Sequence, residues 1–353
     1  MKITSVEVEL VQVPAEPSFR WRQGLPGSER GTTAGILRVK TDEGVEGKAT
    51  CPRGVILQDI VERRLRDELL GQNPFRREWL WERAWEVDRI EEMPIYVLGL
   101  ADIALWDLAG NAYGVPVHEL IGTYRDSIPA YASMVTLSSV SEYLEVADQC
   151  LELGYRAVKL HAWGDARRDA ELAQSLRSHL GEAVDLMYDG SAGFDLAEAV
   201  YVGRALGEAR YTWYEEPMRE FSITAYKWLA NRVDVPLLVA ETSDGAHMNT
   251  ADFIAAGCAT YLRTNPVYKA GFTGALRIAH LADSFRLRAE VHGGGPVSAQ
   301  LCMAIPNTTY YESIVMTNPV MREPLVDAQG MVKASTVPGV DFTHDPISLA
   351  RHG

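Results

Sequence analysis

The chain has few cysteines, no excess of positive charge and no long apolar run. Its four cysteines, among 353 residues, stand far apart without a CxxC pair, so the sequence indicates neither a zinc site nor a disulfide framework. A formal net charge of −14 argues against non-specific binding to nucleic acid or to anionic membranes. We expect no apolar run of membrane-spanning length, and the N-terminus shows no apolar region of a secretion signal. We therefore expect a cytoplasmic protein with no nucleic-acid or membrane partner.

The first part of the chain predicts a mixed α+β unit of about 120 residues, an ordinary size for a domain. Two segments alternate between apolar and polar side chains, as antiparallel strands do, and the second continues into a hairpin. Helical spacing of apolar residues follows in three segments. The strand segments are 3–13, 34–44 and 45–50, and the helical segments are 56–71, 77–89 and 94–114.

From Ile128 onward the pattern changes to a regular alternation of strand and helix. Eight strand candidates with amphipathic segments between them predict a compact (β/α)8-type barrel rather than a doubly wound sheet. After Glu323 the pattern becomes irregular and adds no further strand–helix unit. The strand candidates are 128–134, 156–163, 184–190, 211–217, 236–242, 260–266, 287–294 and 309–314.

Three acidic residues end consecutive strands of this barrel. The interval from Asp189 to Glu215 is 26 residues, and so is the interval from Glu215 to Glu241, which is about one strand, one helix and two loops. The ends of parallel strands meet at one face of a barrel, so these carboxylates are expected to surround one point. Like charges at such a point require a cation, and an all-oxygen site suits a hard ion such as Mg²⁺.

Polar residues also end the neighbouring strands. Lys159 and His161 share one face of their strand, because residues two apart in a strand point to the same side. Further along the chain come Asn265, then His292 before three glycines, and finally Glu312.

This set of residues suits abstraction of a proton α to a carboxylate. A bound cation stabilises the enediolate as charge develops, and a base with a pKa near neutrality removes the proton. Histidine meets this condition with little tuning. The residues leave open whether Lys159, His161 or His292 is the essential base.

These residues and motifs resemble the enolase superfamily, and within it the mandelate racemase-like branch. The resemblance covers nearly the whole chain and implies a (β/α)7β TIM-like barrel with an N-terminal α+β capping domain that the C-terminal segment completes. It is carried by LMYDG (186–190), YEEP (214–217), VAET (239–242), the KLH element, the His292–glycine run and AIPNTTYYE (304–312).

The resemblance also implies boundaries and residue functions. We expect a capping domain at 1–125, a barrel at 126–320 and a C-terminal segment at 321–353. The acids matching the family's pattern, Asp189, Glu215 and Glu241, are expected to bind one Mg²⁺ per active site. The strand-7 residue His292 is implied as a general base, and Glu312 as a hydrogen-bond partner of the substrate carboxylate.

The sequence departs from the family's pattern at three positions. His161 stands where the family usually has a second lysine, and Ser191 stands where it has an asparagine. Asn265 stands where the family has an aspartate paired with the strand-7 histidine. Asn265 can orient His292 by a hydrogen bond, but it cannot stabilise an imidazolium as a carboxylate would.

The resemblance also implies that the capping loop 16–31 and the segment 50–54 shape the pocket for a small carboxylate substrate. Their candidate substrate contacts are Arg20, Trp21, Arg22 and Arg53. Loop arginines suit a polar anionic substrate, so the leading hypothesis is dehydration of an acid sugar by a metal-dependent lyase. The alternatives are a racemase or epimerase of a 2-hydroxy acid or related carboxylate, with His161 and His292 as the two bases, and a catalytically impaired barrel with a binding function. The apolar capping helices favour a homo-oligomer.

Overall fold

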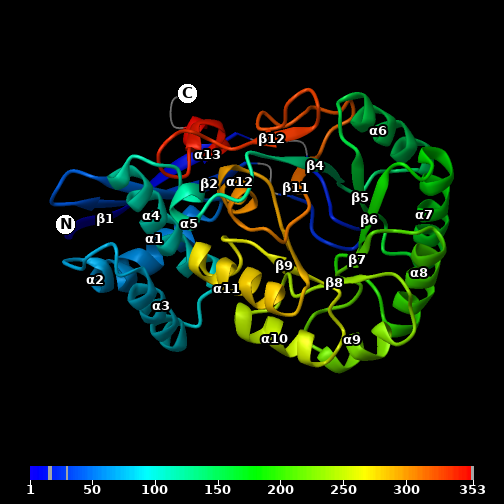
Figure 1. The fold of residues 1–353 in the computed structure, drawn as a ribbon, viewed down its shortest axis with the longest axis horizontal. Coiled ribbons are helices and arrows are strands. Elements are labelled where there is room, and N and C mark those ends of the chain that lie inside the picture. Colours follow the sequence, from blue (N-terminus) through cyan, green and yellow to red (C-terminus); the bar gives the residue numbers. More distant parts are fainter. Residues whose placement is uncertain (15–17, 29–30, 351–353) are drawn as a thin grey trace.

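The computed structural model describes residues 1–14, 18–28 and 31–350. Parts of the expected capping loop, residues 16, 17, 29 and 30, lie outside the described residues. Two units are visible, an N-terminal unit with long strands and a larger ring of helices around a curled sheet (Figure 1). The predicted domain boundaries stay a prediction.

The N-terminal unit contains the predicted antiparallel sheet. Strands β1 (Ile3–Val13), β2 (Thr32–Thr41) and β3 (Glu46–Cys51) pair in sequence order, and both pairs are antiparallel. The helices that follow are α1 (Gly54–Ile60), a π-helical turn (Val61–Leu65), α2 (Arg66–Leu69), α3 (Arg77–Glu91), α4 (Ile95–Tyr113) and α5 (Val117–Ile121).

Helix α4 is a strongly apolar helix that lies in the core of the fold. Among the described residues it alone is long and apolar enough to cross a membrane, so the expectation that no run reaches this length is wrong. However, 83% of the apolar window is buried within the fold. Its two acidic residues, Asp102 and Asp107, are also buried and accept hydrogen bonds from other segments of the chain.

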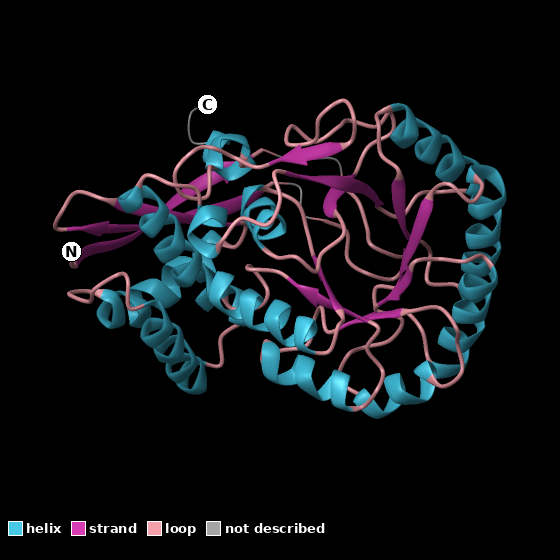
Figure 2. Ribbon diagram, in the orientation of Figure 1, coloured by secondary structure: helices cyan, strands magenta, loops and turns pink. Residues whose placement is uncertain are grey.

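The second unit is the predicted (β/α)7β barrel. Eight parallel strands run in the order β10-β9-β8-β7-β6-β5-β4-β11, with helices between them that form an outer ring (Figure 2). In chain order the elements are β4 (Ser127–Met134), α6 (Val140–Glu152), β5 (Ala157–His161), α7 (Ala166–Leu180), β6 (Asp185–Asp189), α8 (Leu196–Glu208), β7 (Trp213–Glu215), α9 (Ile223–Ala230), β8 (Leu237–Val239), α10 (His247–Ala255), β9 (Tyr261–Thr264), α11 (Gly271–Ser284), β10 (Arg288–Val291), α12 (Pro296–Ala304) and β11 (Tyr311–Val315).

Four of the outer helices, α6 to α9, begin at residues that supply the missing hydrogen bonds of a helix N-terminus. Ser139, Asp165 and Ser222 accept backbone N–H groups at the starts of α6, α7 and α9. Asp195 and Glu198 form a reciprocal capping box at the start of α8. These local signals place each helix start directly after the loop that leaves a barrel strand.

The C-terminal segment touches both units. Strand β12 (Met331–Lys333) pairs antiparallel with β4 of the barrel. Gly339 forms a bridge with Pro116 beside α5, and the short helix α13 (Pro346–Ala350) contacts β1, β2 and β3. A 3-10 turn (Phe342–His344) lies between these contacts. The segment therefore joins the barrel to the N-terminal sheet.

The barrel interior is layered, with apolar residues below charged ones. Side chains alternate in and out along each strand, so residues two apart point to the same side. Lys159, Asp189 and Glu215 each follow an apolar-layer residue by two positions along β5, β6 and β7. This alternation therefore places the three charged side chains above the apolar layer. The apolar layer consists of Tyr131, Ala157, Met187, Trp213 and Leu238.

Candidate active site

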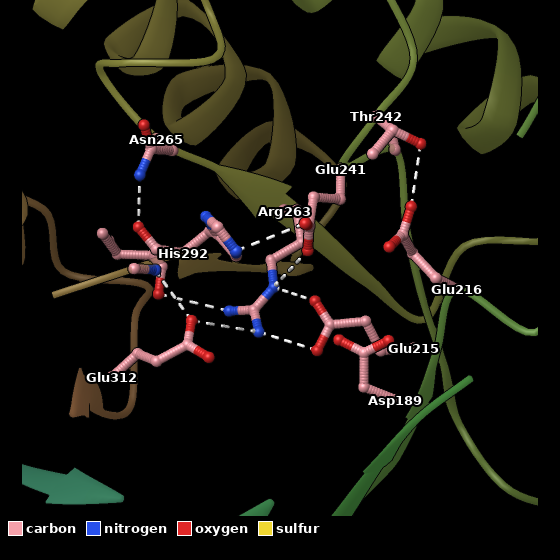
Figure 3. A network of polar contacts seen from close by, with 12 residues as sticks. Asp189, Glu215, Glu216, Glu241, Thr242, Arg263, Asn265, His292 and Glu312 are labelled. Atoms are coloured by element: carbon pink, nitrogen blue, oxygen red, sulfur yellow. Dashed lines mark hydrogen bonds and ion pairs between the residues drawn. The ribbon is translucent and has the colours of Figure 1, made fainter. Parts of the chain in front are cut away.

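A buried network of four charged residues forms the floor of the site, and Figure 3 shows Glu215, Arg263 and Glu312 of this network. Lys159 Nζ lies 2.9 Å from Glu215 Oε2 and 2.8 Å from Glu312 Oε1. Arg263 donates its Nε and Nη2 hydrogens to the two carboxylate oxygens of Glu215. Burial alone would raise the pKa of Glu215, but the charges of Arg263 and Lys159 outweigh it and lower that pKa. Both cations thus hold Glu215 ionised inside the barrel.

Three other carboxylates converge above this floor. Asp189, Glu216 and Glu241 each offer an oxygen, and these oxygens lie within 4.8 Å of one another. All three side chains are buried. Burial, together with the charges of the neighbouring carboxylates, raises the pKa of Glu216 and of Glu241 well above the ordinary value.

The donor set of this cluster fits a hard divalent cation. Three clustered carboxylates repel one another, and a cation removes that cost. The buried Oε2 atom of Glu241 has no hydrogen-bond partner, which is unusual for a carboxylate oxygen. An oxygen-coordinating ion such as Mg²⁺ would bind this oxygen atom and would also offset the repulsion among the three carboxylates.

The cluster contains Glu216 where the sequence predicts Glu215. Glu215 ends β7 and points into the barrel, two residues after the inward-facing Trp213. Glu216 lies one residue further, in the left-handed region with φ of 38°, and its Oε1 accepts a hydrogen bond from Thr242 at 2.8 Å. The two adjacent acids in YEEP were the available signal, but spacing alone could not tell which of them faces Asp189.

His161 faces the carboxylate cluster from β5. Its Nε2 lies 3.0 Å from Asp189 Oδ2, and its Nδ1 lies 2.9 Å from the backbone carbonyl of Met134. The ring is 5% exposed, because Trp21 of the capping loop covers it with a centroid distance of 4.5 Å. A carbonyl oxygen accepts only, so the Met134 contact fixes a proton on Nδ1.

His292 faces the cluster from the opposite flank, after β10. Its Nε2 lies 3.2 Å from Glu241 Oε1, and its Nδ1 has no partner. Burial lowers the pKa of His292 to about 4; the positive charges of Arg263 and Lys159 act in the same direction, and Glu312 opposes them. A neutral imidazole of this kind can accept a proton.

Asn265 does not contact the imidazole of His292. Its Nδ2 donates to the backbone carbonyl of His292, and its Oδ1 accepts the backbone N–H groups of Val267 and Tyr268. The hydrogen bond from Asn265 to His292 therefore reaches the backbone of His292 and not its ring. The reason is that the short amide side chain is already occupied by the loop that follows β9.

Glu312 joins the floor to the glycine run after His292. Its Oε1 pairs with Lys159, and its Oε2 accepts the backbone N–H of Gly293 at 2.7 Å. Burial would raise the pKa of Glu312, but Lys159 and Arg263 outweigh it and hold that pKa well below the ordinary value. Glu312 thus lies in the same polar layer as the other predicted site residues.

A cavity of about 260 Å³ opens beside His292. The glycine run and Tyr268 form its barrel side, and Thr50 and Pro52 of the N-terminal unit form the other side. Asp345 of the C-terminal segment also lines it. The cavity therefore lies where the N-terminal unit meets the barrel at the end of β10.

The predicted capping-loop residues lie mainly over the opposite side, above β5 and β6. Trp21 covers His161, and Arg22 Nε donates to the backbone carbonyl of Ser191 at 2.9 Å. Arg20 accepts the backbone N–H of Thr136 through its own carbonyl. Arg53 immediately precedes α1. Contact of these four residues with a substrate stays a prediction.

Sequence reasoning missed Arg263 as well as Glu216. Arg263 lies on β9 two residues after Tyr261, which packs against the apolar barrel layer, so strand alternation places Arg263 on the inner face. An arginine in the middle of a buried strand segment was the available signal, because arginine is almost never fully buried without a partner.

Comparisons with known proteins identify the family. The description "Enolase C-terminal domain-like" matches residues 142–347, and "Mandelate racemase / muconate lactonizing enzyme, N-terminal domain" matches residues 23–122. The chain belongs to the enolase superfamily. The resemblance inferred from the strand-end motifs is thereby confirmed, and so is the barrel with its N-terminal α+β cap.

Relatives of this enolase-superfamily chain include acid-sugar enzymes. It is 25% identical to the D-galactarolactone cycloisomerase of Agrobacterium fabrum, over 99% of both chains. It is 26% identical to the L-talarate/galactarate dehydratase of Salmonella typhimurium, over 87% of this chain and 79% of the other. A crystal structure of D-glucarate dehydratase from Agrobacterium tumefaciens, complexed with magnesium, superposes with a TM-score of 0.90 at 29% identity, covering 98% of each chain. These relatives support the prediction of a metal-dependent lyase or isomerase of this superfamily.

Proposed function

We propose that the protein is a Mg²⁺-dependent dehydratase of acid sugars. The observation that carries this proposal is the carboxylate cluster, which lies between two histidines that each contact one of its members. A cation site with a base beside it is what removal of a proton α to a carboxylate requires, and a second proton-transfer group can protonate the departing hydroxyl.

Asp189, Glu216 and Glu241 would hold one Mg²⁺ per active site, with Glu215 as the alternative third ligand that the sequence motif indicates. When bound, the ion would neutralise the negative charge that develops on the substrate carboxylate. The protein's own cations Lys159 and Arg263 lie directly below, where they keep Glu215 and Glu312 ionised.

The two histidines would carry the proton transfers. The Nδ1 proton of His161 is held by the Met134 carbonyl, so Nε2 is the atom that exchanges a proton with substrate. One histidine takes the proton from C2, and a general acid protonates the C3 hydroxyl, which leaves as water. The C2–H and C3–O bonds break, a C2=C3 bond forms, and the enol product tautomerises to a 2-keto acid.

An epimerase of the same substrate class is the second candidate. His161 contacts Asp189 and His292 contacts Glu241, so they approach the cluster from two strands far apart in the sheet, β5 and β10. Bases on opposite faces of C2 would invert its configuration. Exchange in D₂O separates the candidates, because an epimerase returns C2-deuterated acid and a dehydratase yields a 2-keto acid.

The test is a screen of mono- and diacid sugars for 2-keto product and for deuterium at C2, with and without Mg²⁺. We expect one group of hydroxy acids to give product, and excess chelator to abolish it. Full turnover by metal-stripped enzyme in chelator would overturn the proposal. Metal binding without turnover or exchange on any acid would leave only the impaired barrel with a binding function.

We also propose a cytoplasmic location and a homo-oligomeric state. Both rest on the sequence, the first on four scattered cysteines that indicate no disulfide framework and the second on its apolar capping helices. Sedimentation equilibrium of the purified protein measures the second directly, and a monomer at micromolar concentration would overturn it.

A further inference from the structure

Glu220 is a buried carboxylate that the proposed mechanism does not use. It lies in the loop between β7 and α9 and is 4% exposed. Its Oε1 accepts the backbone N–H of Ala240, and its Oε2 accepts those of Thr242 and Ser243 at 2.7 and 3.1 Å. These three residues surround Glu241 in the sequence. The Glu220 carboxylate therefore accepts hydrogen bonds from the backbone on both sides of the cluster residue Glu241.

The backbone at this point has an unfavourable conformation. Ala240 follows the end of β8 with φ of 71°, in the left-handed region that is unfavourable for a non-glycine residue. Such a conformation persists only where neighbouring groups hold it. Hydrogen bonds donated to a charged carboxylate are stronger than those donated to a neutral acceptor, so Glu220 is suited to hold this turn.

The same segment also reaches a second member of the cluster. The Thr242 hydroxyl donates to Glu216 Oε1 at 2.8 Å (Figure 3), and Lys269 Nζ donates to the Ser243 carbonyl at 2.8 Å. Lys269 is itself buried. The turn after β8 is thus fixed from two sides, by Glu220 on its N–H groups and by Lys269 on a carbonyl.

We propose that Glu220 is a positioning residue for the cation site, setting the directions of Glu241 and, through Thr242, of Glu216. It does not belong to the converging cluster itself, which consists of Asp189, Glu216 and Glu241. This inference rests on the proposed function, because it requires that the cluster bind a cation. Loss of such a supporting group typically weakens metal binding about 10–100-fold.

Asp107 offers a matched control. It is also a buried carboxylate, 3% exposed, and it accepts backbone N–H groups of Lys48 and Val340 at 2.8 and 2.7 Å. Those partners lie in β3 and the C-terminal segment, outside the cluster. Changing either carboxylate to its amide removes a charged acceptor of backbone N–H groups, but only one of the two lies beside the cation site.

The experiment compares Glu220→Gln, Asp107→Asn and the unmodified protein, each stripped of metal and titrated with Mn²⁺. Isothermal calorimetry gives the affinity, the electron paramagnetic resonance line shape of bound Mn²⁺ reports the ligand geometry, and thermal unfolding of the metal-free proteins reports stability. We expect Glu220→Gln to bind Mn²⁺ about 10–100-fold more weakly with an altered line shape. Asp107→Asn should lose stability and retain both metal properties.

Unchanged Mn²⁺ affinity and line shape in Glu220→Gln would overturn the inference, as would equal losses of affinity in the two variants. If Glu220→Gln does not fold, Glu220→Asp takes its place, since the shorter side chain cannot reach all three N–H groups. That variant should also bind Mn²⁺ more weakly than the unmodified protein. An affinity equal to that of the unmodified protein would overturn the inference. Failure of the unmodified protein to bind Mn²⁺ would instead reject the proposed function.

Discussion

Arg263 binds both carboxylate oxygens of Glu215 inside the barrel, and both side chains are fully buried. Removing one partner of such a pair leaves a buried charge without its counter-ion. Lys159 remains beside Glu215 and offsets part of that loss.

This relationship predicts a large loss of stability for Arg263→Met. We expect the free energy of unfolding in urea to fall by about 3–5 kcal/mol, the range for breaking a buried pair from one side. Arg210→Ala, which removes an exposed partner of Glu182, should cost less than about 1 kcal/mol. Equal losses of unfolding free energy in the two variants would show that the buried pair contributes no more to stability than the exposed one.

Substitution of the adjacent acids Glu215 and Glu216 should affect cation binding differently. In this geometry Glu216→Gln should weaken Mn²⁺ binding at least about 10-fold, because it removes a charged oxygen from the cluster. Glu215→Gln should act mainly on stability, since Glu215 is engaged by Arg263 and Lys159. A larger loss of affinity in Glu215→Gln would assign the third ligand to Glu215, as the sequence motif indicates, and would require its pair with Arg263 to open.

His161→Asn should lower kcat at least about 10²-fold, the usual scale for a general acid or base. Mn²⁺ affinity should change little, because Asn can still hydrogen-bond Asp189. Activity on the substrate found by the screen and Mn²⁺ titration measure the two quantities. A variant with the unmodified rate would leave Lys159 or His292 as the essential base, and His292→Asn then tests the latter by loss of C2 deuteration.

Stability should depend on pH through Asp102. Burial raises the pKa of Asp102 to about 7, although two hydrogen bonds from Thr273 oppose the shift. The unfolded chain releases this proton near its ordinary pKa of about 4, so between about pH 4 and 7 the unfolded state binds fewer protons and stability falls as pH rises. Asp102→Asn should remove this component, roughly 2–4 kcal/mol, from urea unfolding curves measured at pH 5 and 8. Parallel pH profiles for the two proteins would contradict it.

The sequence by itself determined the barrel, because its patterns act locally. Alternation along β1 and β2, the strand-end motifs and the capping residues of α6 to α9 each depend on a few neighbouring residues. Equal spacing was enough to bring the ends of β6, β7 and β8 to one face, since parallel strands end together. The apolar run of α4 was less informative, because a buried core helix and a membrane span share one composition.

Only the tertiary structure decided which polar atoms meet at that face. Glu215 and Glu216 are both glutamates and adjacent in sequence. They point to different partners because the backbone of Glu216 is left-handed and because Arg263 on β9 binds Glu215. Asn265 aligned with a residue expected to hold an imidazole, yet the loop after β9 occupies its side chain. Glu220 carries no motif, and its contacts reach 20 to 23 residues along the chain. Such contacts depend on side-chain direction and long-range packing, which residue spacing does not encode.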